Sequence, residues 1–287
     1  MYYSEEEIDS IVFWLFHWMT GWNKGMVSSG KNEFLSAKLY DTFADVLPRL
    51  KQGEPVQYIT GMVDFLDLKL IVNASVLIPR PETEELADLI IREHIHRRYQ
   101  SLTVLDIGTG SGCLSLALKQ KFPYAQVTGL DISEEALEVA QRNAVKNGLN
   151  VDFLFADILD RSGWRNFPSC DLIISNPPYI PEHKRSGMAS CILDYEPGNA
   201  LFVPDEDPLL FYRAVSAFAK AHLVTPGWVY MEIHESFGSQ VTEIFKNEGF
   251  DPVRILRDIR GKERFAAAEM PMRWQDTSYW MVDKQLP

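Results

Sequence analysis

The spacing of apolar residues along the chain changes from helical to strand-like near residue 62. Over the first sixty residues, from Ile8 onward, apolar side chains recur every three or four positions, which is typical of amphipathic helices. Two shorter patterns over 33–39 and 41–50 predict two further short helices. Over 64–72, apolar and charged residues alternate, which predicts a strand that belongs to a hairpin. A small helical region followed by a short β element is therefore expected.

Beyond residue 100, short apolar runs alternate with helical patterns, which is typical of an α/β fold with a largely parallel sheet. The segment 180–207, between the fourth and fifth predicted strands, is polar and rich in proline, and loops of this length tend to be functional lids. Open α/β sheets bind ligands at the carboxyl ends of their strands, so site residues are expected there. The predicted strands are 102–107, 127–131, 151–155, 171–176, 228–233, 253–256 and 278–282.

The fourth predicted strand runs directly into Asn176, Pro177, Pro178 and Tyr179. Proline has no N–H and keeps the preceding residue extended, so the strand should end with Asn176 at the carboxyl edge. The Asn176 side-chain oxygen and the Pro177 carbonyl would then be two acceptors close together, which suits a planar NH2 donor. Holding both hydrogens turns the nitrogen lone pair toward an electrophile, with Tyr179 packed on the flat group. An ordinary proline-rich loop after a strand is the alternative.

A glycine-rich loop, Gly108 to Gly112 with GxGxG spacing, follows the first predicted strand and opens a helix. Such a loop lets the backbone approach a ligand closely at a helix start. Asp131 ends the next strand about twenty positions on, where a carboxylate typically meets a ribose 2′-OH. The spacing departs from the GxGxxG of pyrophosphate binders, so an adenosine ligand without pyrophosphate is favoured. After the third strand, Asp157 and Ile158 are placed to hold an adenine ring.

Arg80 stands between Pro79 and Pro81 at the entry to a predicted helix. The two prolines leave it little conformational freedom, which makes it a candidate site residue. A simple linker that leads into a helix cap explains the same pattern, and local rules leave both interpretations open.

The formal net charge is −12, from 28 Lys and Arg against 40 Asp and Glu. This balance argues against a broad phosphate-binding surface and favours a small-molecule or basic-protein partner. The three cysteines form no CxxC pair, and neither a signal peptide nor a membrane-length apolar run is seen, so a cytoplasmic protein is expected. The histidines lack metal-ligand spacing, and no metal is expected.

These motifs resemble those of class I S-adenosylmethionine-dependent methyltransferases. Over nearly the whole chain the sequence is similar to the bacterial peptide chain release factor N5-glutamine methyltransferases. The longer motifs that carry this resemblance are 54–61, 77–84, 195–197 and 261–265. The resemblance implies a helical substrate-docking domain over 1–61, a β-hairpin linker over 62–80 and a methyltransferase domain over 81–287. The last would contain a seven-stranded Rossmann-like sheet whose last strand is antiparallel.

The resemblance also implies a substrate and a cofactor. The substrate would be the glutamine of the Gly-Gly-Gln motif of class 1 release factors, and the enzyme is expected to act as a monomer without direct nucleic-acid or membrane partners. In some family members a Trp follows the acidic residue after the third strand, where this chain has Ile158. The implied S-adenosylmethionine site is Gly108, Thr109, Gly110, Ser111, Gly112, Asp131, Asp157, Ile158 and Asn176. The implied catalytic and substrate-binding residues are Asn176, Pro177, Pro178, Tyr179, Arg80, Glu82 and Glu196.

Three other functions are compatible with parts of the pattern. An N6-adenine methyltransferase would use the same four residues, because adenine also carries an NH2 on an sp² carbon, but the net charge of −12 and the absence of a basic-aromatic stripe argue against it. A glutamine on a different protein would leave every motif unchanged. A cofactor-binding regulatory module is disfavoured because the set from Asn176 to Tyr179 is retained.

Overall fold

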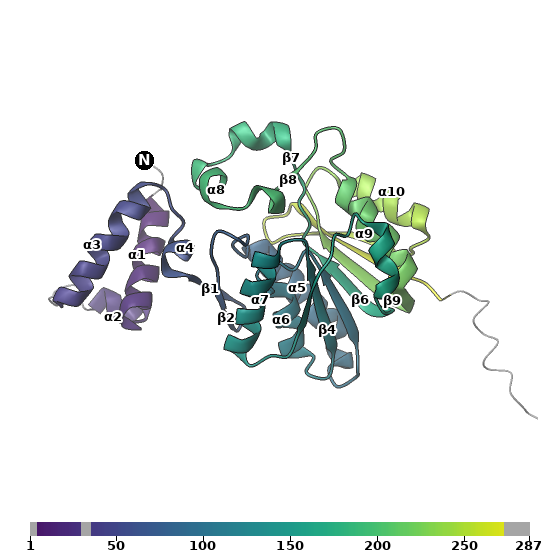
Figure 1. The fold of residues 1–287 in the computed structure, drawn as a ribbon, viewed down its shortest axis with the longest axis horizontal. Coiled ribbons are helices and arrows are strands. Elements are labelled where there is room, and N and C mark those ends of the chain that lie inside the picture. Colours follow the sequence, from purple (N-terminus) through teal and green to yellow (C-terminus); the bar gives the residue numbers. More distant parts are fainter. Residues whose placement is uncertain (1–4, 30–35, 273–287) are drawn as a thin grey trace, which may run out of the picture.

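The computed structural model describes residues 5–29 and 36–272. A small helical unit, drawn in purple in Figure 1, stands beside a larger α/β unit. Its core is formed by Leu15, Val46, Leu50, Val56 and Ile59, since these apolar side chains lie on the facing sides of the helices. The helices of this unit are α1 (Glu5–Thr20), α2 (Lys24–Ser29), α3 (Ala37–Lys51) and α4 (Val56–Thr60).

The helical region confirms the predicted type of structure but not its division into elements. One helix, α3, covers residues that were predicted as two helices over 33–39 and 41–50. The hydroxyl of Ser36 accepts a hydrogen bond from the Leu39 N–H and caps the start of α3, so the helix begins after residue 36. Residues 33–35 lie outside the described part of the chain.

The predicted hairpin consists of β1 (Met62–Phe65) and β2 (Leu68–Ile71), which pair antiparallel with Met62 opposite Ile71. The apolar face of β2 is buried, and Asn143 of the helix α7 (Glu134–Asn147) anchors the strand from the side. Its Nδ2 donates to the Ile71 carbonyl at 2.9 Å and its Oδ1 accepts from the Ile71 N–H at 2.5 Å. The same Nδ2 donates to the Ser111 carbonyl at 2.9 Å, which connects the hairpin to the glycine-rich loop.

The α/β unit is a seven-stranded sheet in the order β10-β11-β9-β6-β3-β4-β5, parallel except for β11. The strands are β3 (Thr103–Ile107), β4 (Gln126–Asp131), β5 (Asp152–Phe155), β6 (Cys170–Ser175), β9 (Leu223–Glu232), β10 (Val253–Arg257) and β11 (Glu263–Met270). The accompanying helices are α5 (Pro81–His94), α6 (Cys113–Lys121), α7 (Glu134–Asn147), α9 (Leu210–His222) and α10 (Gly238–Glu248), with 3-10 turns η1 (Ile95–Arg97) and η2 (Arg161–Asn166).

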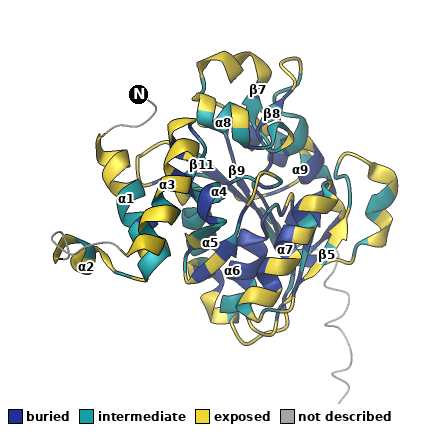
Figure 2. Cartoon of the chain, turned by 60° about the vertical axis from the view of Figure 1, so that its left-hand side comes forward, coloured by how far each residue is buried: buried dark blue, intermediate teal, exposed yellow. Residues whose placement is uncertain are grey.

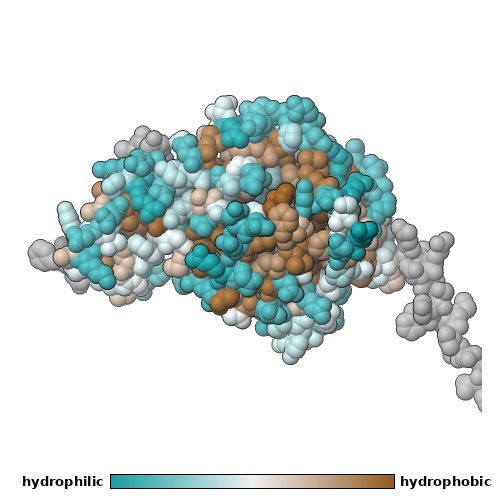
Figure 3. Space-filling view, in the orientation of Figure 1, coloured by the Kyte–Doolittle hydropathy of each residue, from teal (hydrophilic) through white to brown (hydrophobic). Residues whose placement is uncertain are grey.

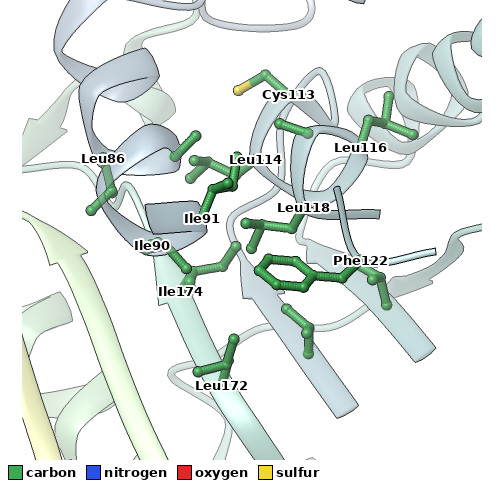
Figure 4. Packing of buried hydrophobic residues seen from close by; sticks show 14 of the residues in the cluster. Leu86, Ile90, Ile91, Cys113, Leu114, Leu116, Leu118, Phe122, Leu172 and Ile174 are labelled. Carbon is green, nitrogen blue, oxygen red and sulfur yellow. The ribbon is translucent and has the colours of Figure 1, made fainter. Parts of the chain in front are cut away.

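Helices cover both faces of the sheet, because its central strands are apolar on both sides. On one face, side chains of α5 and α6 pack on β6, as with Leu86, Leu118 and Ile174 in Figure 4. On the other face, Val215 and Phe218 of α9 and other side chains of α9 and α10 form a second buried cluster. The burial map shows the central strands and the helix surfaces that face them as largely dark blue, whereas β5 at the edge is mostly exposed (Figure 2).

The seventh strand lies where no strand was predicted from the sequence. β11 occupies Glu263–Met270 and is antiparallel to both neighbours, as the family resemblance implied. The strand predicted over 278–282 lies outside the described residues. The expected seven-stranded α/β sheet with a helical N-terminal region and a hairpin is thus confirmed, with β11 as its antiparallel strand.

The predicted lid segment 180–207 has secondary structure of its own and stands above the carboxyl edge of the sheet (Figure 1). Its two short strands pair in parallel, with Ile180 opposite Phe202. Its elements are β7 (Ile180–Pro181), η3 (Glu182–Gly187), α8 (Ser190–Tyr195), η4 (Gly198–Ala200) and β8 (Phe202–Val203). Within residues 5–29 and 36–272, no helix is both long enough and apolar enough to cross a membrane.

A buried histidine at the end of α5 should make folding acid-sensitive. The Nε2 of His94 lies 2.8 Å from the Tyr230 hydroxyl, which donates to Glu93, while the buried Nδ1 has no partner among the described residues. Burial lowers the pKa of His94 from 6.5 to about 4. The folded state therefore stays neutral while the unfolded chain takes up a proton as the pH falls below 6.5. Stability should drop by about 2 kcal/mol between pH 7 and pH 5 on this account.

The His94→Gln variant should lose this part of the pH dependence. Urea unfolding at pH 7 and pH 5 gives, for each protein, the change in the free energy of unfolding between the two pH values. The change in the variant is then compared with the change in the parent. The pKa of Glu93 is lowered, chiefly by its hydrogen bonds from Arg254, so that group titrates below this window in both proteins. Equal pH dependence of variant and parent would contradict the prediction.

Candidate active site

A cavity of about 270 Å³ opens at the carboxyl edge of the sheet, below the segment 180–207. The ends of β3, β4, β5 and β6 all reach it, because parallel strands present their carboxyl ends at one edge. Apolar side chains gather near the middle of this face of the molecule (Figure 3). The lining includes Ile132, Ile158 and Leu159 beside the glycine-rich loop, so the cavity combines an apolar wall with a polar floor.

The glycine-rich loop has the backbone that its composition predicts. Gly110 and Gly112 both have positive φ, at 54° and 80°, where a side chain would be strained. A Cβ on Gly112 would lie 3.3 Å from Ala140 Cβ and from Phe153, because this end of the loop packs closely against α7 and β5. The N–H groups of Gly108 and Thr109 both donate to the Leu130 carbonyl at 2.8 Å, which fixes the loop on the end of β4.

Asp131 lies at the end of β4 and lines the cavity. Its Oδ2 accepts from the Gly110 N–H at 2.8 Å, and its Oδ1 accepts from the Ser133 N–H at 3.0 Å. Burial raises the pKa of this carboxyl, whereas the backbone donors act in the opposite direction. The carboxylate therefore shapes the loop directly and still has lone pairs for further donors.

Asp157 and Ile158 lie on the cavity wall, as the adenine prediction requires. The Asp157 Oδ1 accepts from the Leu159 N–H at 2.8 Å and so closes a local turn. Trp164 is not among the residues that line the cavity. Its Nε1 donates to the Ile158 carbonyl at 3.0 Å, and its ring lies edge-on to Phe218.

Asn176, Pro177 and Pro178 also line this cavity, whereas Tyr179 lines a neighbouring open cavity of about 640 Å³. The Asn176 Nδ2 donates to the Thr83 hydroxyl at 3.0 Å. In the described part of the chain, neither the Asn176 Oδ1 nor the Pro177 carbonyl accepts a hydrogen bond from another protein group. The two residues that carry the acceptors expected from the sequence thus both line the cavity.

Tyr179 turns away from the first cavity and toward a buried carboxylate. Its hydroxyl donates to the Glu232 Oε1 at 2.9 Å, and the ring lies edge-on to His234. Burial together with the neighbouring Glu232 raises the pKa of Tyr179 well above its usual value. The expected packing of this ring on a flat acceptor group stays a prediction.

Arg80 and Glu196, two of the predicted substrate-binding residues, pair with each other. The Arg80 Nη2 lies 2.5 Å from the Glu196 Oε1, and Glu196 Oε2 accepts from the Ile78 N–H at 3.2 Å. The pair ties the segment 180–207 to the entry of α5. Arg80, Glu196 and Glu82 are not among the residues that line either described cavity, so their contact with a substrate stays a prediction.

Breaking this pair should destabilise the protein more than breaking a surface pair. The Glu196 side chain is only 2% exposed, and Arg80→Met would leave its carboxylate buried without its cation. We expect a loss of about 2 kcal/mol in urea unfolding. Arg92→Met, which breaks the Arg92–Asp88 pair at 70% and 50% exposure, should change stability by about 0.5 kcal/mol or less. Equal effects of the two variants would show that the buried pair adds nothing.

Three residues of this region were not singled out from the sequence: Thr83, Asp106 and Glu232. Asp106 is fully buried beneath the loop and its Oδ2 accepts from Thr109 and from both the N–H and the hydroxyl of Ser115. Burial raises the pKa of Asp106 to about 6. Asp106 and Glu232 are acidic residues near strand ends, the same signal that identified Asp131, whereas no local signal marked Thr83.

Over residues 5–29 and 36–272, no group of three or more His, Cys, Asp or Glu side chains is arranged to hold a metal ion.

The sheet order with an antiparallel β11, the glycine loop after β3 and the acid after β4 define a methyltransferase of the Rossmann-like class. Residues 86–193 match the family model described as methyltransferase small domain, and residues 2–61 match the PrmC N-terminal domain. A crystal structure of a methyltransferase from Pyrococcus furiosus shares the fold, with a TM-score of 0.52 and 18% identity over 80% of this chain and 100% of that one.

Curated relatives give the family. The chain is 38% identical to a release factor glutamine methyltransferase of Bacteroides thetaiotaomicron, over 93% of this chain and 94% of the relative. It is 42% identical to one from Lactococcus lactis, over 78% of this chain and 81% of the relative. The chain belongs to the release factor glutamine methyltransferase family and is an enzyme of methyl transfer.

Proposed function

We propose that the enzyme transfers a methyl group from S-adenosylmethionine to the side-chain amide nitrogen (N5) of the glutamine in the Gly-Gly-Gln motif of class 1 peptide chain release factors. The observation that carries this proposal is the pair of acceptors at the cavity, the Asn176 Oδ1 and the Pro177 carbonyl. Both are free of protein donors in the described residues, and a primary carboxamide offers two N–H groups to match them.

The chemistry of the cavity fits the proposed cofactor. Backbone at Gly108 to Ser111 can approach the methionine part closely, because the glycines carry no side chain. The Asp131 carboxylate suits ribose hydroxyls, and the apolar wall at Ile158 suits a flat adenine ring. S-Adenosylmethionine supplies an electrophilic methyl group bonded to a sulfonium.

The chain's own contribution to the reaction is mainly orientation. Asn176 and Pro177 would each accept one hydrogen of the glutamine amide and so direct its nitrogen lone pair at the methyl group. As the N–C bond forms and the S–C bond breaks, positive charge moves to the nitrogen, where the two oxygens stabilise it. The nitrogen then releases one proton to water, and S-adenosylhomocysteine and methylated glutamine remain. No charged general base is required.

The remaining parts of the chain fit a protein substrate in the cytoplasm. The helical unit over 1–61 carries none of the site residues and is proposed to dock the release factor, with 62–80 as the linker and 81–287 as the catalytic domain. The net charge of −12 suits a basic acceptor surface. We propose that the enzyme works as a monomer, without a metal, and without direct nucleic-acid or membrane partners.

Methyl transfer from labelled S-adenosylmethionine to a purified class 1 release factor tests the proposal. The matched control is the same factor with its Gly-Gly-Gln glutamine replaced by alanine, and duplex DNA and ribosomal RNA serve as competing acceptors. Label on the intact factor alone is the expected result. Label on nucleic acid, or on the alanine variant, would overturn the proposed substrate and leave the methyl-transfer assignment standing.

A further inference from the structure

Glu232 carries a buried carboxylate that is connected to Asn176 through Thr83. Glu232, the last residue of β9, is 1% exposed. Its Oε1 accepts from the Tyr179 hydroxyl at 2.9 Å and its Oε2 from the Thr83 hydroxyl at 2.8 Å. As a carboxylate, Glu232 can only accept hydrogen bonds, so both hydroxyl hydrogens must point toward it. Burial raises the pKa of Glu232, while these two donors and Arg264 favour its charged form.

The direction of these bonds determines what Thr83 can do on its other side. A threonine hydroxyl has one hydrogen, and here it is donated to Glu232. Toward Asn176, 3.0 Å away, Thr83 can therefore only accept. The asparagine must present its NH2 to Thr83, which leaves its Oδ1 on the opposite side of the amide.

Without this constraint, the two orientations of an asparagine amide differ little in shape and are distinguished only by hydrogen bonding. In the reversed orientation, the NH2 group of Asn176 would face the NH2 group of the glutamine that is proposed to accept the methyl group. Two donors would then face each other, and one of the two acceptors at the cavity would be lost.

We infer that Thr83 and Glu232 are positioning residues that hold Asn176 in the one amide orientation able to accept from the methyl-accepting nitrogen. The relay runs from Asn176 through Thr83 to Glu232, and it joins the start of α5, the end of β6 and the end of β9. The inferred catalytic consequence rests on the proposed function, whereas the inferred orientation of Asn176 does not.

The Thr83→Val and Thr83→Ser variants form a matched pair, because valine keeps the shape and removes the hydroxyl, whereas serine keeps the hydroxyl. We expect Thr83→Val to lower kcat about 10- to 100-fold, with the Kd for S-adenosylhomocysteine changed less than about threefold. Thr83→Ser should stay within about threefold of the parent in both quantities. Ser216→Ala removes another buried hydroxyl, one without a hydrogen-bond partner among the described residues, and serves as the control for a general packing effect.

Two results separate a positioning role from a structural one. In an Asn176→Ala background, Thr83→Val should lower kcat no further, because its effect acts through Asn176. Glu232→Gln should also lower kcat, since a glutamine can donate to Thr83 and so permits the reversed amide. Unchanged kcat in Thr83→Val, a serine variant as poor as valine, or additive effects in the double variant would overturn the inference.

The orientation itself is measured by NMR on the full chain, without any acceptor. The Asn176 NH2 protons should show a nuclear Overhauser effect to the Thr83 methyl group, and this effect should weaken in Glu232→Gln, which permits the reversed amide. An Asn176 NH2 that points into the cavity and exchanges rapidly with water would overturn the inference. If release factor is not methylated but the NMR contact is present, the proposed substrate fails and the relay stands.

Discussion

Asn176→Ala is expected to slow methyl transfer to the release factor by about 10²- to 10³-fold. The alanine removes the Oδ1 acceptor at the cavity and leaves the Pro177 carbonyl as a single contact, around which the glutamine amide can rotate. The lone pair is then no longer held toward the methyl group. The loss should appear in kcat at saturating cofactor, because the glycine loop and Asp131, which are proposed to bind it, are untouched.

Single-turnover kinetics with labelled cofactor measure this effect, and calorimetry with S-adenosylhomocysteine checks that binding survives. The exposed Asn166, in the 3-10 turn η2, provides a matched asparagine-to-alanine control that should behave as the parent does. A rate for Asn176→Ala within a few-fold of the parent would refute the role assigned to this side chain.

Asp131→Ala is expected to weaken S-adenosylhomocysteine binding by about 100-fold, through two losses. The variant removes the carboxylate proposed to bind the ribose hydroxyls, and it also frees the Gly110 N–H, which Asp131 accepts at 2.8 Å. The loop would then lose part of the shape that its glycines make possible. The affinity for the cofactor should therefore fall, and the methyl group should be held less well in position.

Calorimetric titration with S-adenosylhomocysteine measures the affinity directly. Glu138→Ala removes an exposed carboxylate from the following helix α7 and controls for the change in net charge. Binding by Asp131→Ala at the parental Kd would show that this carboxylate does not contact the cofactor.

Six of the seven strands were predicted from the sequence, including the two edge strands β5 and β10, whereas β11 was not. β3 and β6 are largely buried and rich in apolar residues, and β3, β4 and β6 lead into glycine, acid and proline, respectively. β11 contains three successive alanines, which have low strand propensity and no alternation, so its pairing with β9 and β10 determines its structure. α3 was divided in the prediction because its apolar pattern weakens near Asp41, although the helix continues through it.

The residues of the site that belong to short local motifs were predictable from the sequence. The cavity brings together Gly108 to Ser111, Asp131, Asp157 and the residues Asn176 to Pro178, which were each inferred from their own strand ends. Glu232 offered only the signal of an acidic residue at a strand end, and Thr83 offered none. The role inferred for both lies in contacts between α5, β6 and β9, which are far apart in the sequence. The Arg80–Glu196 pair likewise appears only once the segment 180–207 has folded back.

The insertion of β11 between β9 and β10 has a consequence for the way the protein is made. On the ribosome, Val253–Arg257 emerges before Glu263–Met270, yet β10 is connected to the rest of the sheet only through β11. The nascent domain must therefore wait with one edge of β9 unpaired until the later segment leaves the exit tunnel, a state prone to wrong strand pairing. A premature stop before residue 263 would thus remove more than an edge strand. It would leave β9 without its pairing partner β11, close to Glu232 at the end of β9.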